Sequence, residues 1–384
     1  MLLNMTKSDF LNDYQTKKPF LQKNAFNPDL EWETVDEIIS RCDISSQDFK
    51  LNYQGKVLDK NDYIEEYEDI GKTRYRFIRD RLYFYMQNGA TLIANKIANE
   101  PIIYKYRREI EHLSGRPTLA SLYLAYGEDS SFKAHWDTRD VFVYQFEGKK
   151  RWTIYQPNFE LPINHQQSKD LPNYTCPTTP YMDIILEKGD ILYVPRGWWH
   201  DPIPVGDVSL HLSIGTYPIY PTDFMHWICK LLPDYDIESR KDLFSFKKSK
   251  DHINIISNQF QKLINNEDTF NFFQSQIQEK VYRTETPLNL NLLGNPYNKG
   301  NLPKNFVIDI NIINNIDYSF DFLVINGIKF NVSDESKDVV KFLIENYRVE
   351  YLDLIKKFKN IDLNKLNKLI YDLSISDILS IHGC

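Results

Sequence analysis

The sequence contains little cysteine and no long apolar run. Its four cysteines are scattered, and no two of them form a close Cys-x-x-Cys pair: Cys42, Cys176, Cys229 and Cys384. That spacing excludes a zinc knuckle and a disulfide scaffold. No stretch of about 18 apolar residues is present, and the first residues lack the pattern of a signal peptide. We therefore expect a soluble protein of the reducing cytoplasm, without a membrane partner.

A positive net charge is also absent. The chain carries a net charge of −7, which excludes a protein built as a whole to coat nucleic acid. Its 384 residues indicate two or three domains. Aromatic residues, in contrast, are frequent at 14%, with 25 Tyr and 23 Phe. This abundance fits β-rich structure, because aromatic side chains suit pleated surfaces.

Strand periodicity dominates the middle of the chain, from about residue 118 to 218. Residues 121–126 and 141–146 alternate as strands do, and 147–150 predict a hairpin turn with a return strand over 151–155. Several short strands separated by turns indicate a sandwich or jelly roll. With the helical segments on either side, the expected fold class is α+β.

We expect three parts along the chain: 1–220, which holds the strands together with N-terminal helical and strand elements, a helical region over 221–300, and a small domain over 301–384. In the second part Phe224, Trp227, Ile228 and Leu231 share one helical face. Such a face suits either an internal scaffold or a dimer interface.

The third part predicts three short helices, near 334–346, 350–358 and 362–373, followed by a strand-like run over 375–381. This order resembles a winged helix. Residues 301–384 carry 10 Lys and Arg against 12 Asp and Glu, a net charge of −2, whereas a DNA-reading module should be basic. We therefore expect this part to face proteins and not DNA.

Two segments of the strand region carry potential metal ligands. In the first, His135 and Asp137 stand at positions i and i+2, so on an extended chain both side chains point to one face. In the second, a turn over 195–197 delivers His200 to the start of a further strand. Two histidines and one carboxylate on one face of an octahedral ion are the ligand set of non-haem iron(II) oxygenases. The same donors also suit manganese or zinc.

At this point the chain resembles the JmjC/cupin oxygenases of the ribosomal-oxygenase family. The resemblance rests on GATL at 89–92, HWDTRDVFVYQFEGKKRW at 135–152, GDILYVPRGWWH at 189–200 and SLHLS at 209–213, and on the layout of the helical region and terminal domain. It implies a double-stranded β-helix, a cupin/JmjC jelly roll, with His135, Asp137 and His200 as catalytic metal ligands. It also implies iron(II) as the metal, 2-oxoglutarate and O2 as cosubstrates, and hydroxylation of a protein side chain.

The resemblance further places Lys150 where the family has the cation that binds the distal carboxylate of 2-oxoglutarate. Strand alternation agrees, because Lys150 would share a face with Trp152 while its basic neighbours at 149 and 151 point away. Ser121 matches a position where some relatives have a cosubstrate-binding Asn. His211 and Ser213 form part of a polar stripe on the 209–213 strand and are expected to line the same cavity.

For the substrate, the resemblance points to a protein or peptide, such as a ribosomal protein. Glu128 and Asp129, just before the metal strand, could hold a basic substrate residue. Related oxygenases pair through the helical region, so we expect a homodimer. Two alternatives stay open. One is a peptide-tailoring oxygenase that acts on a precursor peptide, and the other is a non-oxygenase metal cupin. A demethylase is a variant of the hydroxylase, because hydroxylation of an N-methyl carbon uses the same site.

Overall fold

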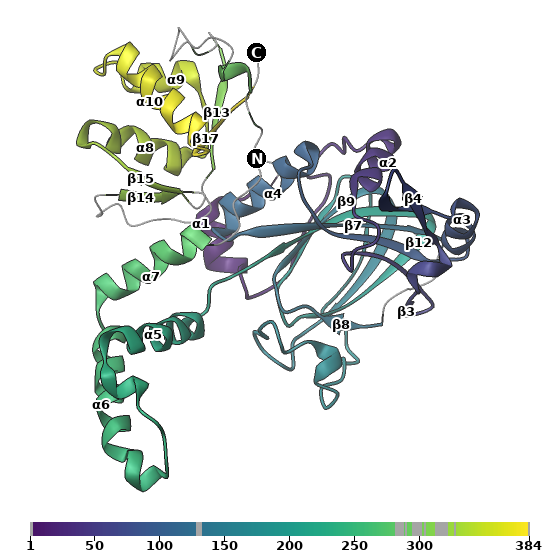
Figure 1. The fold of residues 1–384 in the computed structure, drawn as a ribbon. Coiled ribbons are helices and arrows are strands. Elements are labelled where there is room, and N and C mark those ends of the chain that lie inside the picture. The colour runs from purple at the N-terminus through teal and green to yellow at the C-terminus, as the bar shows by residue number, and fades with distance from the viewer. Residues whose placement is uncertain are drawn as a thin grey trace. The chain divides into compact units, whose positions relative to one another are not determined.

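The computed structural model describes residues 3–127, 133–280, 288, 290–293, 302, 305–311, 322–325 and 328–382. The chain forms two compact units, Met1–Tyr217 and Pro218–Cys384. Figure 1 shows the strands of the first unit and the helices of the second.

The first unit is built on one large antiparallel sheet with strand order β1-β11-β9-β12-β7-β6-β2-β3, to which β8 and β10 add at β12 and β9. Its strands are β1 Phe20–Gln22, β2 Phe49–Tyr53, β3 Lys56–Val57, β6 Thr91–Ile97, β7 Thr118–Tyr126, β8 His135–Trp136, β9 Val141–Tyr155, β10 Met182–Leu186, β11 Ile191–Val194 and β12 Trp199–Thr216. A separate hairpin pairs β4 Ile64–Asp69 with β5 Lys72–Phe77. The helices are α1 Lys7–Asp9, α2 Trp32–Arg41, α3 Arg79–Gln87 and α4 Pro101–Ser114.

The predicted hairpin turn at 147–150 is wrong. Residues 141–155 form one continuous strand, β9, which pairs along its length with the equally continuous β12. Gly148 marks a bulge in this pairing instead of a turn. Its φ is +63°, and a Cβ there would lie 1.7 Å from the carbonyl oxygen of Val208, so only glycine fits. Long-range pairing with β12 thus overrides the local turn signal.

The two faces of β9 are buried against different apolar clusters. Phe142, Tyr144 and Phe146 pack in the larger cluster, where Tyr144 and Phe146 contact Tyr106 of α4. Val141, Val143, Trp152 and Ile154 pack in a second cluster, with Leu192 and Val194 of β11. This second face is the one that lines the site.

The second unit contains the helices α5 Pro221–Tyr235, α6 Phe246–Ile264 and α7 Glu267–Lys280, and then a small α/β part. Phe224 and Ile228 of α5 pack against Phe273 of α7 within the unit. This internal packing takes up part of the apolar face that the sequence offered for a dimer.

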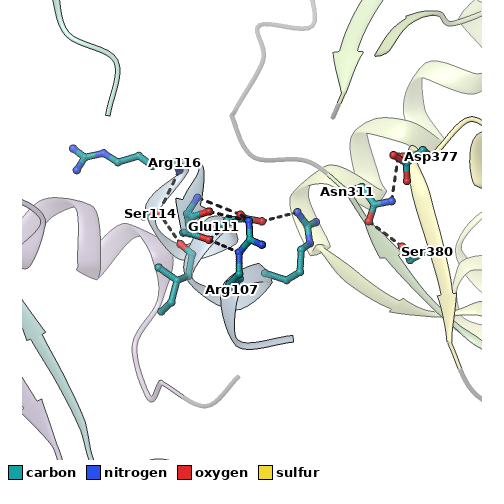
Figure 2. Close-up of polar contacts among 10 residues, drawn as sticks. Arg107, Glu111, Ser114, Arg116, Asn311, Asp377 and Ser380 are labelled. Carbon is teal, nitrogen blue, oxygen red and sulfur yellow. Dashed lines mark hydrogen bonds and ion pairs between the residues drawn. The ribbon is translucent and has the colours of Figure 1, made fainter. Parts of the chain in front are cut away.

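The α/β part holds a three-stranded sheet with the strand order β16-β13-β17 and a two-stranded sheet of β14 and β15. The strands are β13 Val307–Ile310, β14 Phe322–Ile325, β15 Ile328–Asn331, β16 Arg348–Glu350 and β17 Leu379–His382. The helices are α8 Asp334–Asn346, α9 Tyr351–Lys357 and α10 Leu363–Ile375. The three predicted helices are confirmed, but Ile375 ends α10 and the last strand begins only at Leu379. The buried amide of Asn311 joins the end of β13 to β17, because it donates to the carbonyl of Asp377 and accepts from Ser380 (Figure 2).

Among the described residues, no helix combines the length and the apolar character needed to cross a bilayer.

Candidate active site

His135, Asp137 and His200 converge at one point of the first unit. The two-residue strand β8 pairs with the start of β12 in a register that sets His135 opposite His200. One ligand atom from each of the three residues lies within 4.8 Å of the others. Nε2 of His200 is 3.6 Å from Oδ2 of Asp137. The three residues that the sequence pattern singled out therefore lie together in the structure.

Both imidazoles are held by backbone carbonyls in the orientation that a metal ligand needs. Nδ1 of His135 lies 2.8 Å from the carbonyl oxygen of Lys133, and Nδ1 of His200 lies 3.1 Å from that of Trp198. A carbonyl oxygen can only accept, so each Nδ1 carries the proton and, in the neutral ring, Nε2 keeps its lone pair. Nε2 of His200 faces Asp137. This arrangement fits a divalent cation bound by two nitrogens and a carboxylate.

Burial favours the neutral, metal-binding form of His200. The residue is 4% exposed. Burial above all, and the neighbouring His135 next, lower the pKa of His200 to about 4, although the Asp137 carboxylate acts in the opposite direction. The ring also lies against the indole of Trp152, with 5.7 Å between centroids. His200 thus needs no proton removed before it binds a cation at neutral pH.

A cavity opens on one side of the triad. It holds roughly 470 Å³ of space, mouth included, and is lined by Tyr123, His135, Asp137, Val141, Lys150, Trp152, Val194, His200, Pro202, His211 and Ser213. Of the predicted cosubstrate residues, Lys150, His211 and Ser213 are in this set. Ser121 is not among the described residues that line it, although it pairs with Ser213 across β7 and β12.

Lys150 is buried in this cavity wall, with 3% of the residue exposed. Its neighbours Lys149 and Arg151 point outward and form ion pairs with Glu187 and Asp183. The Lys150 side chain makes no ion pair or hydrogen bond with any residue in the described part of the chain, and burial lowers the pKa of its ammonium group to about 7. A buried ammonium without a counter-ion is costly, so the position is suited to an anionic ligand.

His211 and Trp152 supply further unsatisfied groups in the same wall. Nδ1 of His211 and Nε1 of Trp152 are buried and find no hydrogen-bond partner among the residues described. The His211 ring stacks on Tyr123 with 4.8 Å between centroids and 5° between planes. Together with Lys150, these atoms could make polar contacts with one small, anionic ligand.

A second space, called the outer groove below, shares His135 and Asp137 with the inner cavity. It is lined by Asn52, Gly55, Lys133, Ala134, His135, Trp136, Asp137, Thr138, Arg139, Gln167, Ser168, Lys169 and Trp199. Its empty space is about 1180 Å³, the opening included. The two ligands therefore face both a confined cavity and a wide groove.

Sequence reasoning missed Tyr123 and the outer groove, and two predicted substrate residues cannot be placed. Tyr123 shares a strand face with Ser121, so the i, i+2 pattern could have pointed to it. The groove residues at 52–55 and 167–169 are remote in sequence from the motifs and carry no pattern of their own. Glu128 and Asp129 lie outside the described residues.

Comparison with known proteins gives this geometry a family context. Residues 93–223 match the family model described as the JmjC domain. The chain contains a JmjC domain. This segment includes all three residues of the triad, Lys150 and the whole of β12, so the matched segment contains the metal site.

Curated relatives resemble a longer stretch of the chain. The bifunctional lysine-specific demethylase and histidyl-hydroxylase NO66 of Drosophila persimilis is 29% identical over 262 residues, which cover 65% of this chain and 35% of the relative. Ribosomal oxygenase 1 of Danio rerio is 26% identical over 249 residues, or 61% of this chain and 44% of the relative. The chain spans about a third of the length of the first such relatives.

Solved structures of Escherichia coli ribosomal oxygenase YcfD resemble the whole chain. One, in complex with cobalt and 2-oxoglutarate, covers 99% of both chains with a TM-score of 0.58 and 16% identity. At this identity the likeness shows the fold. The predicted fold class, a double-stranded β-helix with helices attached, is confirmed.

Proposed function

We propose that this protein is an iron(II)- and 2-oxoglutarate-dependent oxygenase that hydroxylates a side chain of a protein substrate. The observation that carries the proposal is the pairing, in one cavity, of the convergent triad with the buried, unpaired Lys150. The curated relatives named as hydroxylases and ribosomal oxygenases support the same assignment.

The triad would hold iron(II) through Nε2 of His135, Nε2 of His200 and a carboxylate oxygen of Asp137. Three protein ligands on one face leave the remaining coordination positions for 2-oxoglutarate and O2. When bound, the metal supplies the activation of O2 coupled to oxidative decarboxylation of 2-oxoglutarate. The backbone carbonyls at Lys133 and Trp198 keep both rings oriented for this task.

The inner cavity would bind 2-oxoglutarate. Lys150 would bind its distal carboxylate, with His211 and Ser213 as neighbouring polar contacts in the cavity wall. Apolar walls at Val141, Val194 and Trp152 exclude water from the cosubstrate. Ser121 would act only indirectly, through its partner Ser213.

The outer groove would receive the substrate, because it borders the triad at His135 and Asp137 while Lys150 is not among the described residues that line it. We propose a ribosomal protein as that substrate, by analogy with the names of the relatives. Lys133 and Lys169 give this groove two exposed cations, so an acidic or polar stretch next to the target side chain suits it. Glu128 and Asp129 remain candidates for a basic substrate residue.

We further propose a cytoplasmic homodimer with the three-part division 1–220, 221–300 and 301–384. Among the described residues, Cys42, Cys176 and Cys229 are free thiols, which suits a reducing compartment. Exposed aromatic residues in the helical region support a dimer, as argued below. The winged-helix reading of 301–384 likewise stays a proposal.

The experiment is succinate release with iron(II), 2-oxoglutarate and O2, tested on purified ribosomal proteins and on precursor peptides encoded nearby. Gain of one oxygen atom by a ribosomal protein supports the main proposal, and gain only by a precursor peptide supports the peptide-tailoring alternative. A plain metal cupin would release no succinate. The unpaired Lys150 disfavours that last alternative, because such a protein has no use for an inward cation there.

A further inference from the structure

We propose that Asp140 is a positioning residue that fixes the distance between Asp137 and His200 by tying together the two segments that carry them. The inference rests on the proposed metal site and adds a residue that does not touch the metal. Asp140 follows Asp137 by three residues and is 1% exposed.

The Asp140 carboxylate accepts hydrogen bonds from two other segments of the chain. Its Oδ1 accepts from the backbone N–H of Arg196 at 3.0 Å, and its Oδ2 accepts from the Arg116 guanidinium at 2.8 Å. One buried side chain therefore joins the segment of the first ligands to the turn that leads to His200.

A second bond crosses between the same segments. The backbone N–H of Gly197 donates to the carbonyl of Asp137 itself at 3.0 Å. Gly197 has a φ of +84°, and a Cβ there would lie 2.8 Å from Pro162. Because two successive amides of the turn are bound, to Asp140 and to Asp137, the turn cannot shift without breaking both contacts.

Arg116 gives the carboxylate a fixed anchor. Its backbone N–H bonds to the hydroxyl of Ser114 at the end of α4, and that hydroxyl donates in turn to the carbonyl of Ile110 (Figure 2). Its Nη1 then reaches Asp140, and only 20% of the Arg116 side chain is exposed. The end of α4 thus braces the ligand segments from outside the metal site.

The chain offers a matched control in Asp190. Asp190 is also 1% exposed, and it also accepts from backbone amides, those of Asn24 and Glu187, and from a cation, Lys23. It lies just before β11, whereas the turn held by Asp140 follows β11. Replacing either aspartate removes comparable buried contacts, but only Asp140 binds the segment that leads to His200.

The test compares the Asp140→Asn and Asp190→Asn variants. Calorimetry measures the affinity of each for manganese(II) without any cosubstrate, and the melting temperature of each is measured as well. We expect Asp140→Asn to lose about tenfold or more in manganese affinity, as is typical when a residue that orients the metal ligands is changed. We expect Asp190→Asn to keep wild-type manganese affinity although its melting temperature falls by a similar amount. Equal affinities in the two variants, lowered or not, would overturn the proposal.

Arg116→Gln covers the case in which Asp140→Asn does not fold. It removes the ion pair but leaves the Arg196 amide bonded to Asp140. We expect a loss of manganese affinity of about threefold or more, part of the outer-shell effect, and an unchanged affinity would count against the proposal. If the wild-type protein binds no manganese, the metal site itself is wrong, which is a different failure.

Discussion

Lys150 and His211 line one cavity. Among the residues that the structure describes, Nδ1 of His211 has no hydrogen-bond partner, and the Lys150 side chain forms no hydrogen bond or ion pair. Burial first, and the Lys150 charge second, hold the pKa of His211 well below its usual range. His211 is therefore neutral and Lys150 is the available positive charge. In its protonated form, Lys150 would therefore be the cation that binds an anion in this cavity.

Lys150→Ala should weaken the binding of 2-oxoglutarate and leave the binding of the metal unchanged. A charge-assisted hydrogen bond contributes about 1.5–3 kcal/mol, which is roughly tenfold to a hundredfold in affinity. We expect the KM for 2-oxoglutarate to rise by that factor while manganese affinity stays unchanged. The matched control is Lys149→Ala, whose side chain pairs with Glu187 at the surface. An unchanged KM in Lys150→Ala would mean that the carboxylate binds elsewhere.

The affinity for 2-oxoglutarate should fall as pH rises. Burial lowers the pKa of Lys150 in the free protein to about 7, so above that pH the amine is neutral and must gain a proton to bind a carboxylate. The dissociation constant should then increase up to about tenfold per pH unit above neutrality, and stay flat below it.

Calorimetry of the manganese-loaded protein at several pH values measures this slope. Lys150→Arg is the control, because a guanidinium stays charged and should bind with little pH dependence. A wild-type profile that is flat through pH 7 to 9 (about two units) would contradict a role for Lys150 as the titrating cation.

The helical region should form a dimer through residues that the monomer leaves exposed. Phe244, Phe246 and Phe272 are 72%, 73% and 47% exposed, whereas Phe224 and Ile228 are buried inside the unit. Exposed aromatic area of this kind marks interfaces. We expect sedimentation at twice the 45.6 kDa chain mass, and a shift to monomer in Phe244→Glu/Phe246→Glu. A wild-type monomer at micromolar concentration would reject the dimer.

The protein should not bind duplex DNA. Residues 301–384 carry a net charge of −2, and phosphate contacts need clustered cations. We expect no mobility shift of a duplex by the full chain at physiological salt. Tight binding that weakens steeply with added salt would show that the lysines near the α9–α10 turn act together despite the negative total.

The sequence predicted those parts of the site that depend on local periodicity. The shared face of His135 and Asp137 and the inward direction of Lys150 follow from strand alternation, and the structure has both. Pairing between distant strands was not predictable. The sequence predicts a turn at Gly148, but the structure has a bulge in the pairing of β9 with β12 there. Tyr123 belongs to the cavity wall because its strand pairs it with His211.

The C-terminal part shows the same limit. Helical periodicity located α8, α9 and α10, but the apolar run from Ile375 did not distinguish the end of a helix from the start of a strand. A short apolar run is ambiguous until its neighbours in space are known. The predicted substrate contacts at Glu128 and Asp129 have no structural outcome, because they lie outside the described residues.

The most direct test of the proposed oxygenase is iron-dependent conversion of 2-oxoglutarate to succinate, measured by mass spectrometry for wild type and for Asp137→Ala. We predict succinate formation by the wild-type protein that requires both iron(II) and O2, increases with a ribosomal-protein substrate, and is abolished in a folded Asp137→Ala variant. Succinate formation by Asp137→Ala at the wild-type rate, or none by wild type with any protein or peptide offered, would contradict the account.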